Sequence, residues 1–193
     1  MFRKFLLSLT FLTLISFITG ATIMAKSTPA KAAENPLENT LYLDLKDGRV
    51  VIEMRPDLAP KHVKRIKELV RQGFYDGLVF HRVIDGFMAQ TGDPTGTGAG
   101  GSGQKLKAEF SKEPHMRGAL SMARAQDVNS ADSQFFICLA GANFLDGQYT
   151  YWGRVTSGME FVDKIKKGDK NDNGAVSDPD KIIKMQVAAD VKE

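Results

Sequence analysis

The sequence predicts a mainly β domain in which an antiparallel sheet closes into a barrel, accompanied by two helices. Three observations support this prediction. Short segments alternate apolar and polar residues, tight turns separate most of them, and helix-type spacing of apolar residues occurs in only two places. A length of 193 residues suits one domain with a sizeable core and an N-terminal tail.

The first predicted hairpin is the clearest element. Leu41, Leu43 and Leu45 share one face of a strand over 40–45, and a turn at Gly48 leads into a returning strand over 49–54. Further strands are predicted over 80–84, 87–90, 118–123, 133–140, 148–155 and 181–188.

Two segments, 61–72 and 158–167, have the apolar spacing of amphipathic helices. Pro60 suits the first turn of the first helix, and Gly73 suits its end. The basic residues of this helix are interpreted as a solvated face and not as a phosphate site. The residues predicted to face the core are Val63, Ile66, Leu69 and Val70 in the first helix and Met159, Val162 and Ile165 in the second.

Residues 1–32 have the organisation of an export signal. Arg3 and Lys4 form a positive start, and 5–18 is an apolar run without charge. Ala30-Lys31-Ala32 then provides the small-residue pattern of a cleavage site. We therefore expect export from the cytoplasm.

An uncleaved membrane anchor is the rival interpretation, because the apolar stretch continues to Ala25 and approaches the roughly 20 residues of a span. Cleavage after Ala21 or Ala25 also stays open. Downstream, 33–38 is predicted to be a short linker and 39–193 the barrel domain. After cleavage we expect no stable membrane association.

The charge balance excludes a nucleic-acid footprint. Four of the 26 basic residues lie within 1–32, where there is no Asp or Glu. Removing that segment leaves 26 − 4 = 22 basic and 23 acidic residues, a net charge of −1. Neither nucleic acid nor an anionic membrane surface is indicated as a partner.

The single cysteine, Cys138, cannot form an internal disulfide, and its apolar strand predicts a buried, inert thiol. The three histidines, His62, His81 and His115, form no metal-binding motif, so no metal is expected. A Ser-His-Asp hydrolase stays open as the runner-up enzyme class, because such triads assemble across a fold, but no G-x-S-x-G motif occurs.

Residues 92–103 form a glycine-rich stretch that contains a formal G-x-G-x-x-G at 96–101. No helical pattern follows these glycines and no βαβ unit surrounds them, so a dinucleotide site is rejected. The stretch is interpreted as a mobile surface loop that forms one wall of a site.

The central stretch of the sequence, 80–90, combines large apolar residues with one permanent cation. Strand alternation places Arg82 on one face and His81 on the other, so His81 is interpreted as a packed histidine. Gln90 follows Met88 on the same face. The alternative is that Arg82 only extends from a strand edge into solvent.

Several separated motifs occur in order along this sequence: Phe80–Gln90, Gly92-Asp93, Leu120–Ala125, Ser133–Ile137 and Leu145–Gly147. Together they resemble the motifs of the cyclophilin family of peptidyl-prolyl cis–trans isomerases. The resemblance covers about 39–191 and implies an eight-stranded antiparallel barrel with a helix closing each end.

The resemblance also implies a site. Arg82 matches the catalytic arginine of the family, and the matched positions of the substrate groove are Phe87, Met88, Gln90, Ala123, Arg124, Ala125, Gln134, Phe136, Phe144, Leu145 and Tyr149. Phe144 stands where animal members often carry a tryptophan, which implies weak cyclosporin binding. Tyr149 and Arg124 replace a common histidine and a common asparagine.

The physics of the implied reaction requires no cofactor. Rotation about an X–Pro bond faces a barrier of about 18–20 kcal/mol, and no bond has to break. An arginine at the site would favour the twisted amide by donating a hydrogen bond at any working pH.

The partners implied are proline-containing unfolded or extended polypeptides, and the motifs resemble bacterial exported members, which implies the periplasm. A monomer is expected, and a peptide-binding chaperone without turnover is the alternative from another class.

Overall fold

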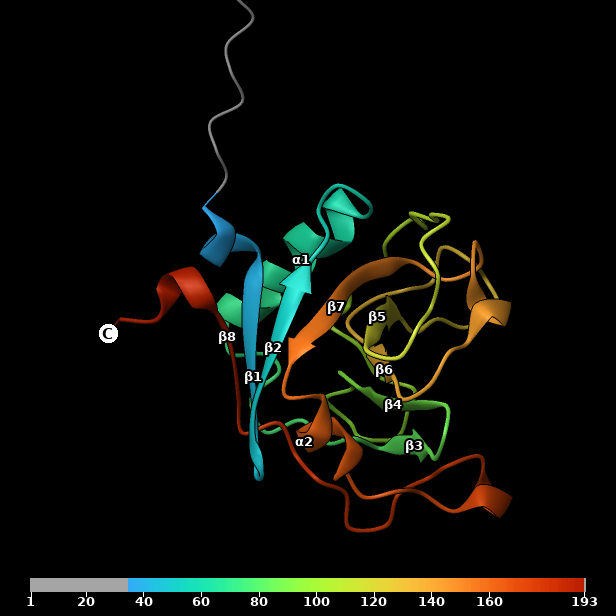
Figure 1. Cartoon of the computed structure of the whole chain (residues 1–193). Helices are drawn as coiled ribbons and strands as arrows, with labels where there is room; N and C mark the ends of the chain where they lie inside the picture. The colour runs from blue at the N-terminus through green and yellow to red at the C-terminus, as the bar shows by residue number, and fades with distance from the viewer. Residues whose placement is uncertain (1–34, 193) are drawn as a thin grey trace, which may run out of the picture. The chain divides into compact units, whose positions relative to one another are not determined.

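The computed structural model describes residues 35–192 (Figure 1). The predicted export signal and its cleavage positions lie outside the described residues. Within 35–192, no helix is both long and apolar enough to cross a membrane.

Eight strands form one sheet in which every neighbouring pair is antiparallel. The order across the sheet is β3-β4-β6-β5-β7-β2-β1-β8. The mainly β class with two helices is therefore confirmed. The strands are β1 (Thr40–Leu45), β2 (Gly48–Met54), β3 (Arg82–Ile84), β4 (Met88–Thr91), β5 (Ala119–Met122), β6 (Phe135–Cys138), β7 (Tyr151–Ser157) and β8 (Lys184–Val187).

Closure of the sheet into a barrel is the part of the fold prediction that strand pairing does not establish. Within 35–192, the edge strands β3 and β8 are not paired with each other, so the ladder describes an open half-barrel. Three backbone hydrogen bonds of 2.8–2.9 Å instead join the segment 77–80, just before β3, to 180–182, just before β8. These two segments are irregular, which prevents a continuous ladder.

Helix α1 (Pro60–Arg71) agrees with its prediction to within one residue, and its predicted apolar residues are buried. It lies against β8, whereas the second helix, α2 (Met159–Asp163), lies against β2 (Figure 1). Ala59 has no side chain that could cap α1. The carboxylate of Glu109 takes this role from a distant loop, by accepting bonds from the N–H groups of Lys61 and His62 at 3.1–3.2 Å.

Helix α2 (Met159–Asp163) is shorter than the predicted 158–167. The N–H groups of Lys164 and Ile165 bond to carbonyls three residues back, which tightens the last turn. The next N–H, of Lys166, donates to the Asp180 carboxylate at 2.8 Å and so leaves the helix. Short 3-10 turns complete the structure at η1 (Pro36–Asn39), η2 (Asn143–Leu145), η3 (Lys170–Asp172) and η4 (Ala188–Asp190).

The main apolar core lies between the sheet and the helices. Trp152 is fully buried there and meets Phe135 edge-on, with 5.4 Å between ring centroids. A second, smaller apolar cluster gathers around Met88, Phe136 and Leu145. This second cluster supports the candidate site.

Candidate active site

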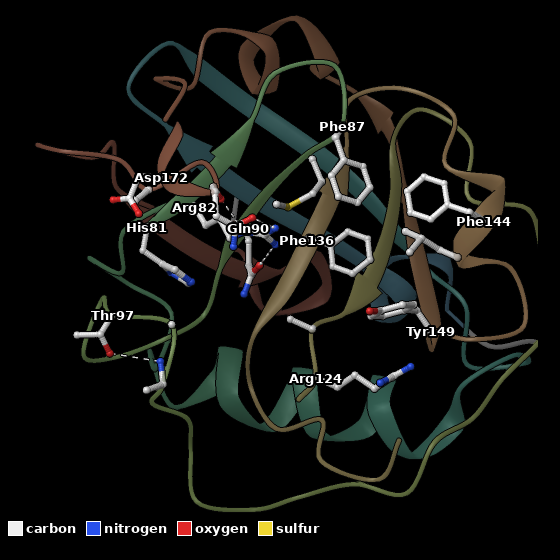
Figure 2. A pocket seen from close by; sticks show the side chains of 17 residues that line it. His81, Arg82, Phe87, Gln90, Thr97, Arg124, Phe136, Phe144, Tyr149 and Asp172 are labelled. Carbon is white, nitrogen blue, oxygen red and sulfur yellow. Dashed lines mark hydrogen bonds between the residues drawn. The ribbon is translucent and has the colours of Figure 1, made fainter. Parts of the chain in front are cut away.

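A cavity of about 790 Å³ is lined by residues of β3, β4 and β6 and by the loops beside them (Figure 2). Ten of the predicted site residues line it: Arg82, Phe87, Met88, Gln90, Ala123, Arg124, Phe136, Phe144, Leu145 and Tyr149. The remaining two, Ala125 and Gln134, line a cavity of about 320 Å³ that shares several residues with the first. The structure therefore brings all the predicted site residues into one groove.

Strand register explains why the main groups meet. Arg82 on β3 pairs directly with Gln90 on β4, and Gln90 pairs with Phe136 on β6. The tight turn that joins β3 to β4 contains Gly86, whose φ of 70° favours glycine. A cation, an amide and an aromatic ring thus lie in one row across three strands.

A chain of hydrogen bonds holds the polar part of this row. Arg82 Nη1 donates to Gln90 Oε1 at 3.1 Å, and Gln90 Nε2 donates to Gln134 Oε1 at 2.9 Å. Gln134 Nε2 in turn donates to the carbonyls of Gly98 and Gly100 at 2.9 and 2.8 Å. Arg82 is therefore held in place and does not simply extend into solvent.

Asn173 holds the other side of the guanidinium. Arg82 Nε donates to the Asn173 carbonyl at 3.0 Å, and Nη2 donates to its Oδ1 at 2.8 Å. Burial lowers the pKa of Arg82 from its ordinary value, but an arginine keeps its charge at any working pH. In the described part of the chain no carboxylate forms an ion pair with Arg82, so its charge is directed at whatever occupies the cavity.

Sequence reasoning missed Asn173, because it lies in a polar loop that is distant from Arg82 in sequence. Its φ of 48° is in the left-handed region, where Asn is one of the tolerated residues. The pair Asn173-Gly174 is a turn signal, which identifies the local conformation and not the partner.

The glycine-rich loop is built around a buried carboxylate. Asp93 accepts hydrogen bonds from the backbone N–H groups of Thr95, Thr97, Gly98 and Gly100 at 2.6–3.1 Å. Burial opposes the ionisation of Asp93, yet these bonds together outweigh it and lower its pKa to about 2. The amides of Thr97, Gly98 and Gly100 within the G-x-G-x-x-G stretch are thus satisfied internally, and the loop lines the cavity as predicted.

The other half of the cavity is apolar. Met88, Phe136 and Leu145 form its floor with 1%, 4% and 6% of their surface exposed, and Phe87 lies beside them half-buried. A floor of this kind offers a small apolar ring a dry surface without hydrogen-bonding groups.

Aromatic side chains form the rim of the apolar half. Phe144 is 66% exposed and tilts against Phe87, with 5.4 Å between ring centroids. Tyr149 meets Phe136 edge-on at 5.8 Å, and the guanidinium of Arg124 lies 4.6 Å from the Tyr149 centroid. Arg124 also donates to the carbonyls of Ala125 and Gln148, which holds its side chain against the rim.

The position of His81 agrees with one part of the sequence-based interpretation and contradicts the other. His81 is buried, as a packed histidine would be, but it lines the same cavity as Arg82 and is not separated from it on an opposite face. The alternation rule fails because β3 begins only at Arg82, so His81 is not part of the strand. Phe80, the residue before His81, donates its N–H to the Asp180 carbonyl and lies outside the β3–β4 pairing.

A Ser-His-Asp arrangement does occur, but it is closed off. His115 Nδ1 lies 2.8 Å from Asp146 Oδ1, and its Nε2 lies 2.7 Å from Ser121 Oγ. Ser121 is completely buried, His115 is 1% exposed, and neither lines the cavity. A nucleophile must reach its substrate, so this triad ties the η2 turn to β5 and does not form a hydrolytic centre.

Neither the cysteine nor the acidic and histidine side chains of the described residues add another reactive centre. Cys138 is fully buried, and burial raises the pKa of its thiol to about 12, which confirms the predicted inert thiol. Among residues 35–192, no cluster of three or more His, Cys, Asp or Glu side chains could hold a metal ion.

Comparison with known proteins decides the family. The model of the family "Cyclophilin type peptidyl-prolyl cis-trans isomerase/CLD" matches residues 40–187. The chain belongs to this family. A probable peptidyl-prolyl cis–trans isomerase of Brucella suis is 58% identical over 167 residues, which cover 80% of this chain and 85% of that protein. Peptidyl-prolyl cis–trans isomerase B of Bacillus subtilis is 46% identical over 133 residues, or 67% of this chain and 92% of that protein.

Solved structures agree. A cyclophilin from Hirschia baltica superposes with a TM-score of 0.72 at 28% identity, covering 81% of this chain and 76% of that one. A cyclophilin-type isomerase from Cryptosporidium parvum, crystallised in the presence of the dipeptide Ala-Pro, superposes with a TM-score of 0.70 at 30% identity. The match covers 77% of this chain and 98% of that one. The protein is a peptidyl-prolyl cis–trans isomerase with a cyclophilin fold.

Proposed function

We propose that Arg82 catalyses rotation about X–Pro bonds by donating a hydrogen bond to the proline nitrogen in the twisted amide. In that state conjugation is lost, and the nitrogen lone pair becomes an acceptor. The observation that carries this proposal is the guanidinium of Arg82 at the edge of an apolar floor, where Gln90 and Asn173 hold it and no carboxylate among residues 35–192 forms an ion pair with it.

The energies are consistent with this role. A charge-assisted hydrogen bond contributes about 1.5–3 kcal/mol, which corresponds to roughly tenfold to a hundredfold in rate. The remainder of the acceleration comes from the desolvated floor, formed by Met88, Phe136 and Leu145, and from holding the flanking backbone. Gln90 and the 123–125 edge are placed to hold that backbone.

The substrates that fit this groove are unfolded or extended polypeptides that contain proline. The cavity is open and continues into a second one along the 123–125 edge, so an extended chain can cross it. The presence of Ala-Pro in the crystals of the Cryptosporidium relative supports the same substrate class.

The cellular role that we propose is assistance to the folding of exported proteins in the periplasm. It is supported by the positive start, apolar run and Ala-x-Ala pattern within residues 1–32. N-terminal sequencing of protein recovered from the periplasm tests this role: a start after Ala21, Ala25 or Ala32 supports it, and an intact Met1 in the membrane fraction contradicts it.

Two smaller proposals concern partners. We expect a monomer, which analytical ultracentrifugation tests directly. We also expect weak cyclosporin binding, because the phenyl ring of Phe144 offers no N–H donor where animal cyclophilins carry an indole. Phe144→Trp is expected to tighten cyclosporin binding, and unchanged affinity in a calorimetric titration would contradict this reasoning.

A coupled-protease assay on an X–Pro peptide tests the activity itself. Wild-type protein is expected to accelerate cis-to-trans conversion well above the uncatalysed rate. Peptide binding without acceleration would instead indicate a chaperone module. Mass spectrometry of the same peptide, incubated without the protease, separates isomerisation from hydrolysis: an unchanged mass is expected, and a cleaved product would indicate hydrolysis instead.

A further inference from the structure

Asp172 is a charged residue of the cavity that the proposed mechanism does not use. The cavity is lined by two arginines, Arg82 and Arg124, and Asp172 on η3 is the only carboxylate among the lining residues. The side chain of Asp172 is exposed. Figure 2 shows it at the margin of the cavity on the Arg82 side, whereas Phe144 and Tyr149 lie on the opposite side.

The two arginines are held by other groups of the protein, but the carboxylate is not. Arg82 donates to Gln90 and Asn173, and Arg124 donates to backbone carbonyls. In the described part of the chain, the carboxylate of Asp172 has no hydrogen bond and no ion pair. A single exposed charge contributes little to the stability of a fold. The charge of Asp172 is therefore available to a molecule that occupies the cavity.

The backbone fixes the point from which this carboxylate projects. The side chain of Asp169 caps η3, and the Asp169 carbonyl accepts the N–H of Asp172 at 3.2 Å. The carbonyl of Asp172 accepts the N–H of Ala175 at 2.9 Å. The next residue, Asn173, holds Arg82 through both its carbonyl and its Oδ1. Asp172 thus has a defined place relative to the catalytic arginine, and the two do not form an ion pair.

We propose that Asp172 determines substrate specificity by favouring polypeptides that carry Lys or Arg close to the proline, in the flank of the bound chain nearest to η3. This inference rests on the proposed isomerase site. A long basic side chain in that flank can reach the carboxylate, whereas Asp or Glu at the same position meets a like charge.

The other charges of the cavity make this effect specific to one side. The guanidinium of Arg82 directs its charge into the cavity, and Arg124 places a second positive charge at the Tyr149 rim. Both favour acidic side chains in a bound chain, and Asp172 alone among the charged lining residues acts in the opposite sense. Because exposed charges act on encounter and binding, the preference is expected in kcat/KM with little change in kcat.

Two sets of X–Pro peptides test this role by NMR exchange at low salt. The variable residue is Lys, Ala or Glu, placed two positions before the proline in one set and two positions after it in the other. We expect the wild type to prefer Lys over Ala, and Ala over Glu, by about two- to fivefold per step in one of the sets. Asp172→Asn should abolish this preference, and Asp172→Lys should reverse it. Salt at about 0.5 M should reduce the wild-type preference, because it screens exposed charges.

Asp178→Asn is the matched control. Asp178 is an exposed carboxylate of the same loop that does not line the cavity, and its φ of 52° suits Asn. The variant removes the same charge and should keep the wild-type preference.

The ratios between peptides decide the outcome. A wild type without preference in either set, a preference that Asp172→Asn retains, or one that Asp178→Asn also abolishes overturns the inference. An equal fall for all three peptides in Asp172→Asn, with unchanged ratios, overturns it as well, because it would indicate a structural role through Asn173. Failure of the wild type to accelerate exchange of any peptide would overturn the proposed function instead, so the two failures are distinguishable.

Discussion

The two halves of the groove are built by opposite means. In the polar half, Arg82 and Gln90 are half-buried, Gln134 is buried, and hydrogen bonds link the three side chains. In the apolar half, Met88 and Phe136 belong to an apolar cluster and are almost fully buried. The difference indicates that the polar half serves chemistry with little contribution to stability, whereas the apolar half serves both.

Phe136→Ala is expected to have the largest effect, because the Phe136 ring belongs both to the floor of the cavity and to a buried apolar cluster. Loss of a buried phenyl typically costs about 3 kcal/mol or more, which corresponds to roughly 10 °C in melting temperature for a domain of this size. The same change should lower kcat/KM at least tenfold. Calorimetry and a peptide assay measure the two effects.

Phe136→Leu is the matched variant, and it should retain a larger share of both stability and activity. If Phe136→Ala were inactive but as stable as the wild type, the ring would serve only the substrate. The proposed double role of the apolar half would then be wrong.

Asp93→Asn is expected to have the second-largest effect. It replaces a carboxylate that accepts several backbone N–H bonds with an amide that offers one oxygen and two competing donors. We expect a loss of about 2 kcal/mol in the free energy of unfolding and a smaller loss of activity, since the loop carbonyls that hold Gln134 would shift. Denaturant unfolding and the peptide assay measure the two losses.

The pH dependence gives a second test of Asp93. Its pKa is lowered from 3.8 to about 2, so the folded state favours the ionised form. The unfolded state binds the extra proton in this range, so this stabilisation, about 2 kcal/mol, is complete above pH 4 and is lost as the pH falls toward 2. In Asp93→Asn this part of the acid destabilisation should disappear, and an unchanged acid profile would contradict the account.

Asn173→Gly is expected to change activity with little change in stability, which sharpens the comparison from the polar side. Glycine accepts the φ of 48° and keeps the carbonyl bond to Arg82, but it removes the Oδ1 bond. A fall of about two- to fivefold in kcat/KM is expected. Asn173→Ala should behave similarly but melt lower, because a Cβ is strained at this φ. Equal melting temperatures for the two variants would contradict the reasoning.

Phe144→Ala is expected to have the smallest effect on stability. The ring is 66% exposed, so the free energy of unfolding should change by less than about 0.5 kcal/mol. Any loss of activity should depend on peptide length, because the rim meets residues beyond the proline. Kinetics on a short and a long peptide measure this dependence, and a large stability loss would place Phe144 in the core instead.

The fold and much of the site could be predicted because the signals are local. The alternation around Leu41 and the spacing in α1 report directly on burial, and the β3–β4 turn brings Arg82 opposite Gln90 within a few residues. The residues of the apolar floor were predicted only from the family resemblance, which rests on several motifs in the expected order. Length and periodicity alone would not have assigned Phe136 to a site.

The parts that could not be predicted depend on irregular backbone or on distant partners. Strand alternation predicts the wrong face for His81 because the ladder starts at Arg82, two residues later than the predicted start at Phe80. Asn173 reaches Arg82 from a loop about ninety residues away. The backbone bonds between the segments 77–80 and 180–182 replace part of the ladder that the predicted strands 80–84 and 181–188 would have formed, and the sheet stays open there. Such contacts become visible only once the chain is folded.

The most direct test of the central claim is an NMR exchange measurement on an X–Pro peptide with wild type, Arg82→Lys and Arg82→Ala at equal concentration. We expect Arg82→Ala to lose about tenfold to a hundredfold in exchange rate, Arg82→Lys to lose most of that factor, and all three proteins to melt within a few degrees of one another. An Arg82→Ala protein that exchanges the peptide as fast as the wild type would contradict the account.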